Sequence, residues 1–336
     1  MGQDGEMHVV AAPDKFRGTA TAAAAAAAIS RAVTAAGHSC DQVPMADGGE
    51  GTLDALGGPN RTTIVTGPLG EPVEAAWQLS RGRAVIEMAQ ASGLLLAGGP
   101  DGNDPMEATT AGVGELISAA MEAGARRIIV GVGGSATTDG GLGALRAIHP
   151  IQRLRGVELI VACDTRTPFV EAAERFAAQK GASPAQIKLL GRRLDRLAQA
   201  YLADHEVDVT EMEGAGSAGG LAGGLAAVGA VLHSGFDVVA DETELADRLE
   251  HAQLVVTGEG FLDDESFEGK VVGGVADLAA ELGVPALAVV GQVYDGADGR
   301  VPTISLVERF GEDRAMRDTE ACIAEAVTEW LAAMPG

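Results

Sequence analysis

Residues that can bind phosphate or a metal ion follow several short apolar runs of the sequence. Five such turns carry glycine, carboxylate or hydroxyl groups: Pro13-Asp14-Lys15, Asp47-Gly48-Gly49-Glu50-Gly51-Thr52, Gly133-Gly134-Ser135-Ala136-Thr137, Cys163-Asp164 and Thr257-Gly258-Glu259-Gly260. Glycine lets a backbone approach phosphate closely, and free backbone N–H groups at a helix start bind its oxygens. Carboxylates in the same place would repel phosphate unless Mg²⁺ lies between them. The combination therefore predicts a site for a nucleotide with Mg²⁺.

The longest of these turns is the glycine-rich loop at residues 131–141, GVGGSATTDGG. It contains a degenerate dinucleotide pattern at Gly131, Gly133 and Ala136. Its hydroxyl and carboxylate groups are not needed by a nicotinamide site, and no Gly-Lys-Ser/Thr follows, so it is not a Walker A loop. Taken alone, the loop is compatible with a phosphate site, a dinucleotide site or a tight turn between a strand and a helix.

Lysine is rare in this chain, which has only Lys15, Lys180, Lys188 and Lys270 against twenty arginines. Two of the four are next to glycine, in Gln179-Lys180-Gly181 and Gly269-Lys270. Phosphoryl transfer needs fixed positive charge near the β- and γ-phosphates. Lys180 could instead satisfy carbonyls at a helix C-terminus. Lys270 is expected at a helix start, where a cation opposes the dipole, and this favours a functional role.

Apolar runs alternate with longer helical stretches through most of the chain, which predicts a parallel sheet covered by helices. Strands are expected at 8–12, 41–45, 127–130, 158–163, 254–257, 286–290 and 303–307, the fifth ending before Gly258. Helices are expected at 19–36, 51–56, 109–123, 142–148, 168–203 with a break at 181–184, 270–282 and 319–333. Only turn residues separate the runs at 62–66, 73–79 and 84–89, so these predict a meander at the entrance to a second domain.

Length and charge limit the classes of function. A chain of 336 residues favours two domains, since single cores stop growing near ~250–300 residues. The net charge of −24 excludes nucleic acid and anionic membranes as expected partners. Cys40, Cys163 and Cys322 are far apart and form no CxxC pair, so we expect neither a disulfide framework nor a zinc site, and a reducing cytoplasm fits. We expect no signal peptide and no membrane span.

The order of the motifs resembles that of the bacterial glycerate kinases of the glycerate 2-kinase type, along nearly the full length. Residues 12–19 look like the family's APDSFKGS, and residues 46–52 reproduce ADGGEGT. Residues 133–140 look like GGSATNDGG, with Thr138 in place of the usual Asn. Further along, Cys163-Asp164 with Gln179-Lys180-Gly181, residues 214–225 and residues 257–270 resemble the remaining family segments.

The resemblance implies a fold and an activity. It implies an α/β protein of two domains, in which a second mixed α/β domain (61–250) is inserted into a flavodoxin-like parallel-sheet domain (1–60 and 251–336). It also implies an active site in the cleft between the domains. The implied reaction is ATP-dependent phosphorylation of D-glycerate to 2-phosphoglycerate with Mg²⁺. No oligomeric state is implied.

Motif position and chemistry together suggest roles for individual residues. We expect these catalytic residues: Asp47, Asp164, Lys180 and Lys270. We expect these substrate-binding residues: Asp14, Arg17, Gly48 and Gly49. We expect ATP to contact Gly133, Gly134, Ser135, Ala136, Thr137 and Gly258. We expect Glu50, Asp139 or Glu259 to hold Mg²⁺. The substrate hydroxyl would give its proton to Asp47 or Asp164, while Arg17 or Lys180 would bind the substrate carboxylate.

The sequence departs from the family pattern at four places. Residues 165–171 replace a usual stretch with Gly and Asn, residues 149–158 form a short connection, Phe261 stands where Arg is frequent, and Arg17 replaces a common Lys. These departures bear on the identity of the substrate. Three alternatives stay open beside a glycerate kinase: a kinase of another small hydroxy acid, a non-catalytic relative that binds a metabolite, and a nicotinamide oxidoreductase built on the glycine-rich loop.

Overall fold

The computed structural model describes residues 6–334 apart from 17, 164, 268 and 295–298. Within the described residues the chain forms two compact units, one made of Met1–Asp47 and Phe236–Gly336 and the other of Gly48–Gly235. The second unit is thus inserted into the first. The chain passes from one unit to the other at 47/48 and 235/236, earlier than the expected domain boundaries at 60/61 and 250/251. The expected domain boundaries and the expected cleft stay predictions.

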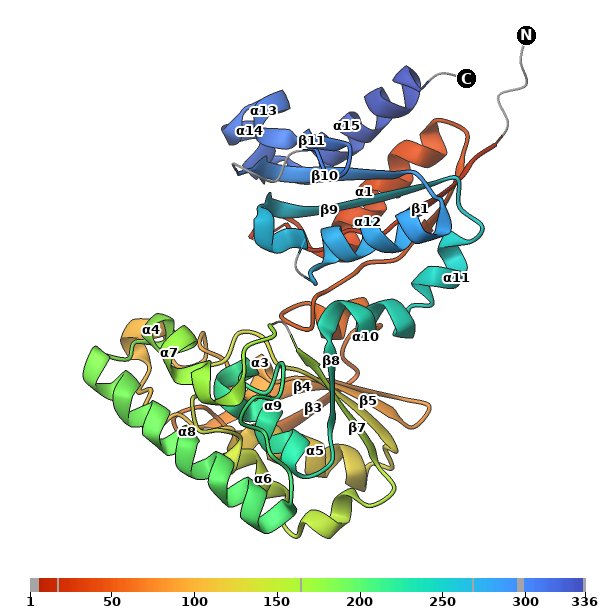
Figure 1. Cartoon of the computed structure of the whole chain (residues 1–336). Coiled ribbons are helices and arrows are strands. Elements are labelled where there is room, and N and C mark those ends of the chain that lie inside the picture. The colour runs from red at the N-terminus through yellow and green to blue at the C-terminus, as the bar shows by residue number, and fades with distance from the viewer. Residues whose placement is uncertain (1–5, 17, 164, 268, 295–298, 335–336) are drawn as a thin grey trace. The chain divides into compact units, whose positions relative to one another are not determined.

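The discontinuous unit has a five-stranded sheet in which every described pairing is parallel (Figure 1). Its strands are β1 (His8–Ala11), β2 (Ser39–Gln42), β9 (Leu254–Leu262), β10 (Ala286–Val293) and β11 (Thr303–Ser305). Their order across the sheet is β2-β1-β9-β10-β11, so that the strands of this unit, counted along the chain, lie in the order 2-1-3-4-5. This is the flavodoxin order, and it confirms the expected fold class for this unit.

Helices cover both faces of this sheet (Figure 1). They are α1 (Ala22–Ala35), α12 (Val271–Leu282), α13 (Leu306–Phe310), α14 (Glu312–Arg317), α15 (Thr319–Ala333) and the 3₁₀ turn η4 (Asp264–Phe267). The short helices α10 (Gly235–Glu242) and α11 (Leu245–Leu249) precede β9 in the chain. Along β10, Leu287 and Val289 pack with α1 and α15, while Ala288 and Val290 pack with α12. Successive side chains of a strand point to opposite faces of the sheet. A strand that is buried on both faces therefore has a continuous apolar sequence.

The inserted unit has a six-stranded mixed sheet. Its strands are β3 (Arg61–Thr66), β4 (Pro72–Ser80), β5 (Arg83–Glu87), β6 (Arg127–Gly131), β7 (Glu158–Cys163) and β8 (Val231–Ser234), in that order across the sheet. The pairs β3–β4 and β4–β5 are antiparallel, which confirms the expected meander, and β5 to β8 are parallel. The mixed α/β class expected for this unit is therefore confirmed.

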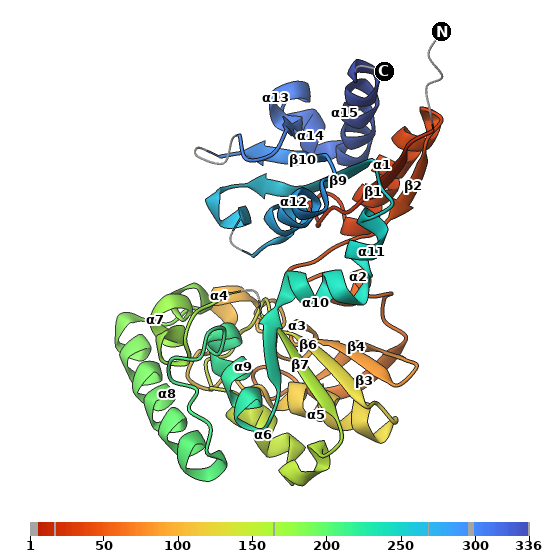
Figure 2. The ribbon, with the colours of Figure 1, turned by 45° about the vertical axis from the view of Figure 1, so that its right-hand side comes forward.

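The helices of the inserted unit pack mainly on one face of its sheet (Figure 2). They are α2 (Thr52–Ala55), α3 (Ala89–Ser92), α4 (Gly99–Gly102), α5 (Ala111–Glu122), α6 (Leu142–Ile148), α7 (Ala172–Phe176), α8 (Pro184–His205) and α9 (Ser217–Ala227), with 3₁₀ turns η1 (Ile151–Leu154), η2 (Phe169–Glu171) and η3 (Ala178–Lys180). The Ser183 hydroxyl and Gln186 form a capping box that starts α8 beside Pro184. No described helix of either unit is long and apolar enough to cross a membrane.

The structure corrects three local expectations and adds two elements. Strand β9 continues through Gly258 and Glu259 to Leu262, because it stays paired with the long β10. Strand β2 precedes the expected segment at 41–45, since its register against β1 places it at Ser39–Gln42. The last strand is short because the Ser305 hydroxyl accepts a hydrogen bond from the Glu308 N–H and starts α13. Strand β8 and helix α10 were not expected from the sequence.

Helix α9 contains a kink at three residues in the left-handed conformation, Ala218, Gly219 and Gly220, with φ of 53°, 64° and 89°. A Cβ on Gly219 would lie 2.0 Å from the Thr137 carbonyl oxygen. The Gly140 N–H donates a hydrogen bond to the Gly219 carbonyl. The kink therefore brings α9 against the backbone of the glycine-rich loop, where a side chain does not fit.

We predict that Gly219→Ala destabilises the protein by at least about 2 kcal/mol, because the added methyl group meets a buried carbonyl in a strained backbone conformation. The matched control is Gly191→Ala in the middle of α8, where a Cβ meets nothing within 4 Å. That change should stabilise the helix by roughly 0.5–1 kcal/mol. Urea unfolding of both variants measures the difference, and equal stability of the two would contradict the packing argument.

Candidate functional site

The glycine-rich loop leaves the end of β6 and packs directly on a second glycine turn at residues 48–51. A Cβ on Gly133 would lie 2.5 Å from the Gly49 Cα, and one on Gly48 would lie 2.6 Å from the Ala162 carbonyl oxygen at the end of β7. Gly48 also has a φ of 88°, which favours glycine. Glycine is therefore required on both sides of this contact, and the structure brings together Gly48, Gly49 and Gly133.

The side chain of Lys180 packs against this loop in the interior of the inserted unit, and the residue is 3% exposed. Its Nζ donates hydrogen bonds of 2.7 Å to the Ser135 hydroxyl and of 2.7 Å to the Thr137 carbonyl. Lys180 ends η3, yet the carbonyl it binds belongs to the glycine-rich loop and not to its own helical turn. Lys180 was expected either to serve a phosphate site or to satisfy carbonyls at the end of a helix. The observed contacts favour the first expectation, because its ammonium binds the loop expected to hold phosphate.

Asn103, which was not singled out in the sequence, joins the same two segments. Its Nδ2 donates hydrogen bonds to the carbonyls of Ala136 at 3.0 Å and of Lys180 at 2.9 Å. Its Oδ1 is buried and has no hydrogen-bond partner among the described residues. An amide at the turn after α4 carries no sequence signal for this role, because both of its partners are backbone atoms distant in the chain.

Asp139, expected to hold Mg²⁺, instead caps two helices. Its Oδ2 accepts hydrogen bonds from the Thr110 N–H, the Thr110 hydroxyl and the Gly143 N–H, and its Oδ1 accepts from the Gly141 N–H. These bonds occupy the start of α6, and within the loop the Ala136 N–H donates to the Ser92 carbonyl at 2.9 Å. The backbone amides that we consider for phosphate are therefore those of residues 133–135 and 137, and not those of the helix start. The contacts of Asp139 favour a positioning role, and its metal role stays a prediction.

Glu87, at the end of β5, was also missed and holds the second glycine turn. Its Oε1 accepts hydrogen bonds from the N–H groups of Gly51 at 2.9 Å and Leu53 at 2.7 Å. Burial raises the pKa of this carboxyl, against the lowering effect of these two bonds. An acid within the apolar run Val85-Ile86-Glu87-Met88 was the available sequence signal.

A second group of polar residues lies in the discontinuous unit, around β9. The Asp14 N–H donates to the Gly258 carbonyl at 2.8 Å, which ties the turn after β1 to β9. Glu259 has one carboxylate oxygen that is buried and has no hydrogen-bond partner among the described residues. The pKa of Glu259 is raised to about 7, mainly by burial and in smaller part by Asp14 and Asp263, while Ser266 and Lys270 oppose the shift. This carboxyl is therefore the most strongly perturbed acid described around β9.

The other predicted site residues occupy simpler positions. Gly258 pairs with Val289, and a Cβ there would lie 2.0 Å from the Val289 carbonyl oxygen, so close strand packing explains this glycine. Lys270 stands directly before α12, as expected. Asp47 is half-buried and precedes Gly48, while Glu50 is exposed. Arg17 and Asp164 lie outside the described residues.

The capacity of the site for metal and cofactor follows from these contacts. No group of three or more His, Cys, Asp or Glu side chains in the described ranges is arranged to hold a metal ion. The unpartnered oxygen of Glu259 does fit Mg²⁺, which prefers carboxylate oxygens. The dinucleotide interpretation of the glycine-rich loop loses support, because α6 begins only at Leu142 and Asp139 already caps it.

We predict opposite effects for two substitutions at Glu87. Glu87→Ala leaves the N–H groups of Gly51 and Leu53 unpaired, at a cost of about 1–3 kcal/mol each, and should disable the turn. Glu87→Gln keeps an acceptor and removes a buried charge. The raised pKa means that the wild type gains stability as pH falls through the folded pKa toward the lower pKa of the unfolded chain. The Gln variant should therefore be more stable at pH 7, with its advantage shrinking at lower pH; a pH-independent difference in urea unfolding would contradict this.

Comparison with known proteins assigns the chain to a family. The Glycerate kinase family profile matches residues 9–150 and 148–334. The chain is 38% identical to the glycerate 2-kinase of Escherichia coli K12 over 86% of each chain, and 36% identical to the glycerate kinase of Bacillus subtilis 168 over 97% of this chain and 100% of that one. A crystal structure assigned as a glycerate kinase 2 of Salmonella typhimurium LT2 is 34% identical and superposes with a TM-score of 0.84 over 98% of both chains. The chain is therefore a kinase of the glycerate kinase family.

Proposed function

We propose that this kinase transfers the γ-phosphoryl group of ATP to the 2-hydroxyl of D-glycerate, giving 2-phosphoglycerate and ADP, with Mg²⁺. The observation that carries the proposal is the Lys180 ammonium, which is buried against the Ser135 hydroxyl and the Thr137 carbonyl. A fixed cation behind a loop of small residues is what a transferring phosphate group needs. The names of the relatives support glycerate as the substrate.

In the proposed reaction the C2 oxygen of glycerate attacks the γ-phosphorus while the bond to the β-phosphate oxygen breaks. Negative charge spreads over the transferring oxygens and onto ADP. We assign the amides of residues 133–135 and 137 and the Lys180 ammonium to stabilising that charge. Because their positions are fixed before the substrate binds, they need no reorganisation during the reaction.

The hydroxyl proton of glycerate needs a carboxylate acceptor, and Asp47 and Asp164 remain the two candidates. Mg²⁺ supplies neutralisation of the phosphate oxygens, and Glu259 is the residue whose unpartnered oxygen would hold it. We assign Asp14, Arg17, Gly48 and Gly49 to binding glycerate. We also propose a cytoplasmic location, which is supported by the absence of a disulfide at Cys40, Cys163 and Cys322 in the described part of the chain.

One observation favours a second candidate, a kinase of another small hydroxy acid. The segment after Asp164 differs from the family pattern, and there the hydroxyls of Thr165 and Thr167 lie 2.9 Å apart. ADP release measured with D-glycerate and a panel of small hydroxy acids separates the candidates. We expect D-glycerate to give the highest kcat/KM. A better substrate in the panel would replace D-glycerate, and ligand-induced thermal stabilisation without ADP release would indicate a non-catalytic binder.

We predict that Lys180→Met lowers kcat by about 10²–10³-fold, the usual loss when a preorganised donor to a transition state is removed. The matched control is Lys188→Met, the same change at an exposed position of α8. It should keep wild-type activity. Steady-state kinetics with ATP and D-glycerate measure both variants, with circular dichroism to verify folding. A folded Lys180→Met enzyme with wild-type kcat would remove this lysine from the reaction.

A further inference from the structure

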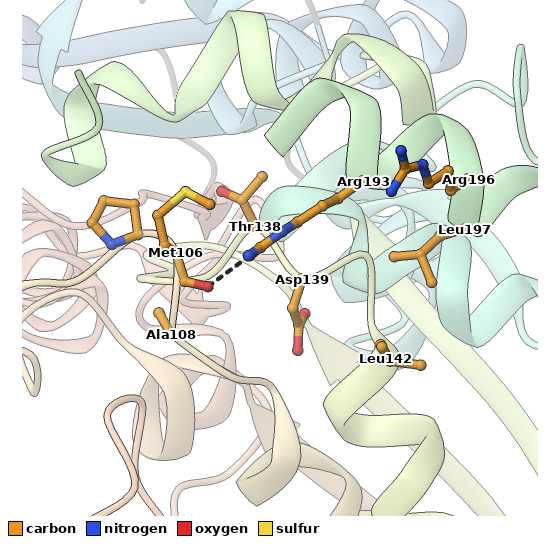
Figure 3. Close-up of a pocket in the computed structure, with 9 residues that line it drawn as sticks. Met106, Ala108, Thr138, Asp139, Leu142, Arg193, Arg196 and Leu197 are labelled. Atoms are coloured by element: carbon orange, nitrogen blue, oxygen red, sulfur yellow. Dashed lines mark hydrogen bonds between the residues drawn. The ribbon is translucent and has the colours of Figure 1, made fainter. Parts of the chain in front are cut away.

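A cavity of about 310 Å³ lies in the inserted unit beside the end of the glycine-rich loop. The turn before α5, the start of α6 and one face of α8 enclose it (Figure 3). Met106, Leu142 and Leu197 supply apolar walls, and Thr138, Arg193 and Arg196 supply polar groups. Cavities that bind small ligands have about 300–1,000 Å³, with mostly apolar walls and a few polar groups, so this one suits a ligand of modest size.

The Thr138 hydroxyl is the first sign that the cavity binds a ligand. Thr138 is 2% exposed, and its Oγ1 has no hydrogen-bond partner among the described residues. Its side chain lies near those of Met106 and Arg193 in the cavity wall (Figure 3). A buried hydroxyl without a partner is unfavourable, typically by about 1–3 kcal/mol. A polar atom of a bound molecule would satisfy it.

The two arginines are the second sign. Arg193 reaches from α8 across to the Met106 carbonyl, to which its Nη1 donates a 2.8 Å hydrogen bond (Figure 3). Arg196 lies one helical turn further along the same wall. Neither guanidinium has an acidic partner within ion-pair distance in the described ranges. Asp139 also lines the cavity, but its oxygens already accept four hydrogen bonds from the Thr110, Gly141 and Gly143 groups.

This set of groups indicates a ligand that is flat or apolar in its body and also carries anionic and hydrogen-bonding groups. An inorganic anion would leave the apolar walls unused, and a purely apolar molecule would leave the hydroxyl and the guanidinium groups unused. Guanidinium planes stack well on aromatic rings and also bind phosphate oxygens.

Two residues that line the cavity are next in sequence to the proposed phosphate-binding segment, and this indicates which ligand the cavity binds. Thr138 and Asp139 directly follow residues 133–137, to which the proposed function assigns the phosphates of ATP. Because Thr138 is the residue after Thr137, the wall of the cavity begins where the proposed phosphate-binding segment ends. We infer that the cavity holds the nucleoside part of the phosphoryl donor, a purine ring with its ribose, with Thr138, Arg193 and Arg196 as binding residues. This inference rests on the proposed function.

Three variants test the assignment by ADP titration calorimetry and by the KM for ATP. Thr138→Val keeps the shape of the side chain and removes the hydroxyl, and should weaken ADP binding about 3- to 10-fold, the usual effect of one hydrogen bond. Arg196→Ala should weaken it at least about 3-fold. The control is Arg192→Ala, an exposed position of α8 outside the cavity wall. All three should leave the KM for D-glycerate unchanged.

Stability separates a binding role from a structural one. Removing an unpartnered buried hydroxyl should leave the melting temperature of Thr138→Val unchanged or higher, while its affinity for ADP falls. Unchanged ADP affinity in both Thr138→Val and Arg196→Ala would overturn the inference while leaving the proposed function intact. If the wild type phosphorylates no hydroxy acid, the proposed function is wrong. The ADP titration then still tests whether the cavity binds the nucleoside. Binding weakened by the two variants would support the cavity as the nucleoside site, and absent or unaffected binding would overturn it.

Discussion

The close approach of three backbone segments is the constraint on which the rest of the inserted unit depends. The glycine-rich loop touches the turn at residues 48–51 through Gly133 and Gly49, and it touches the kink of α9 through Thr137 and Gly219. None of these contacts leaves room for a Cβ. The conformation of the loop is therefore set by neighbours on two sides, and packed backbones shift less readily than side chains.

Around this contact, charged groups are fixed by several bonds each. The Lys180 ammonium binds the loop from behind, and Asp139 uses both carboxylate oxygens to hold the starts of α5 and α6. Glu87 holds the second glycine turn through one carboxylate oxygen, which accepts two backbone hydrogen bonds. Such anchoring gives a phosphate-binding loop its electrostatic value, since catalytic groups that are positioned in advance stabilise charge most effectively. The left-handed residues of α9 have an unfavourable backbone conformation, which persists because the packing of the kink against the glycine-rich loop holds it in place.

Much of the fold could be predicted because its signals are local. The alternation of apolar runs and helices indicated the parallel strands, and the turn-separated runs before residue 90 indicated the meander. The extension of β9 through Gly258 and Glu259 could not be predicted, because it depends on its pairing with β10. The same holds for the site: Lys180 stood out as a rare lysine beside glycine, whereas Asn103 and Glu87 act through backbone groups distant in the chain. The sequence likewise offered no way to tell that Asp139 caps helices, since a capping carboxylate and a metal ligand look alike in a loop.

The most direct test of the central claim is a crystal structure of this kinase with a non-hydrolysable ATP analogue, Mg²⁺ and D-glycerate. We expect phosphate oxygens to lie within about 3 Å of backbone nitrogens of residues 133–135 and 137, the usual hydrogen-bond distance. A triphosphate bound elsewhere, with these amides free of phosphate, would contradict this expectation.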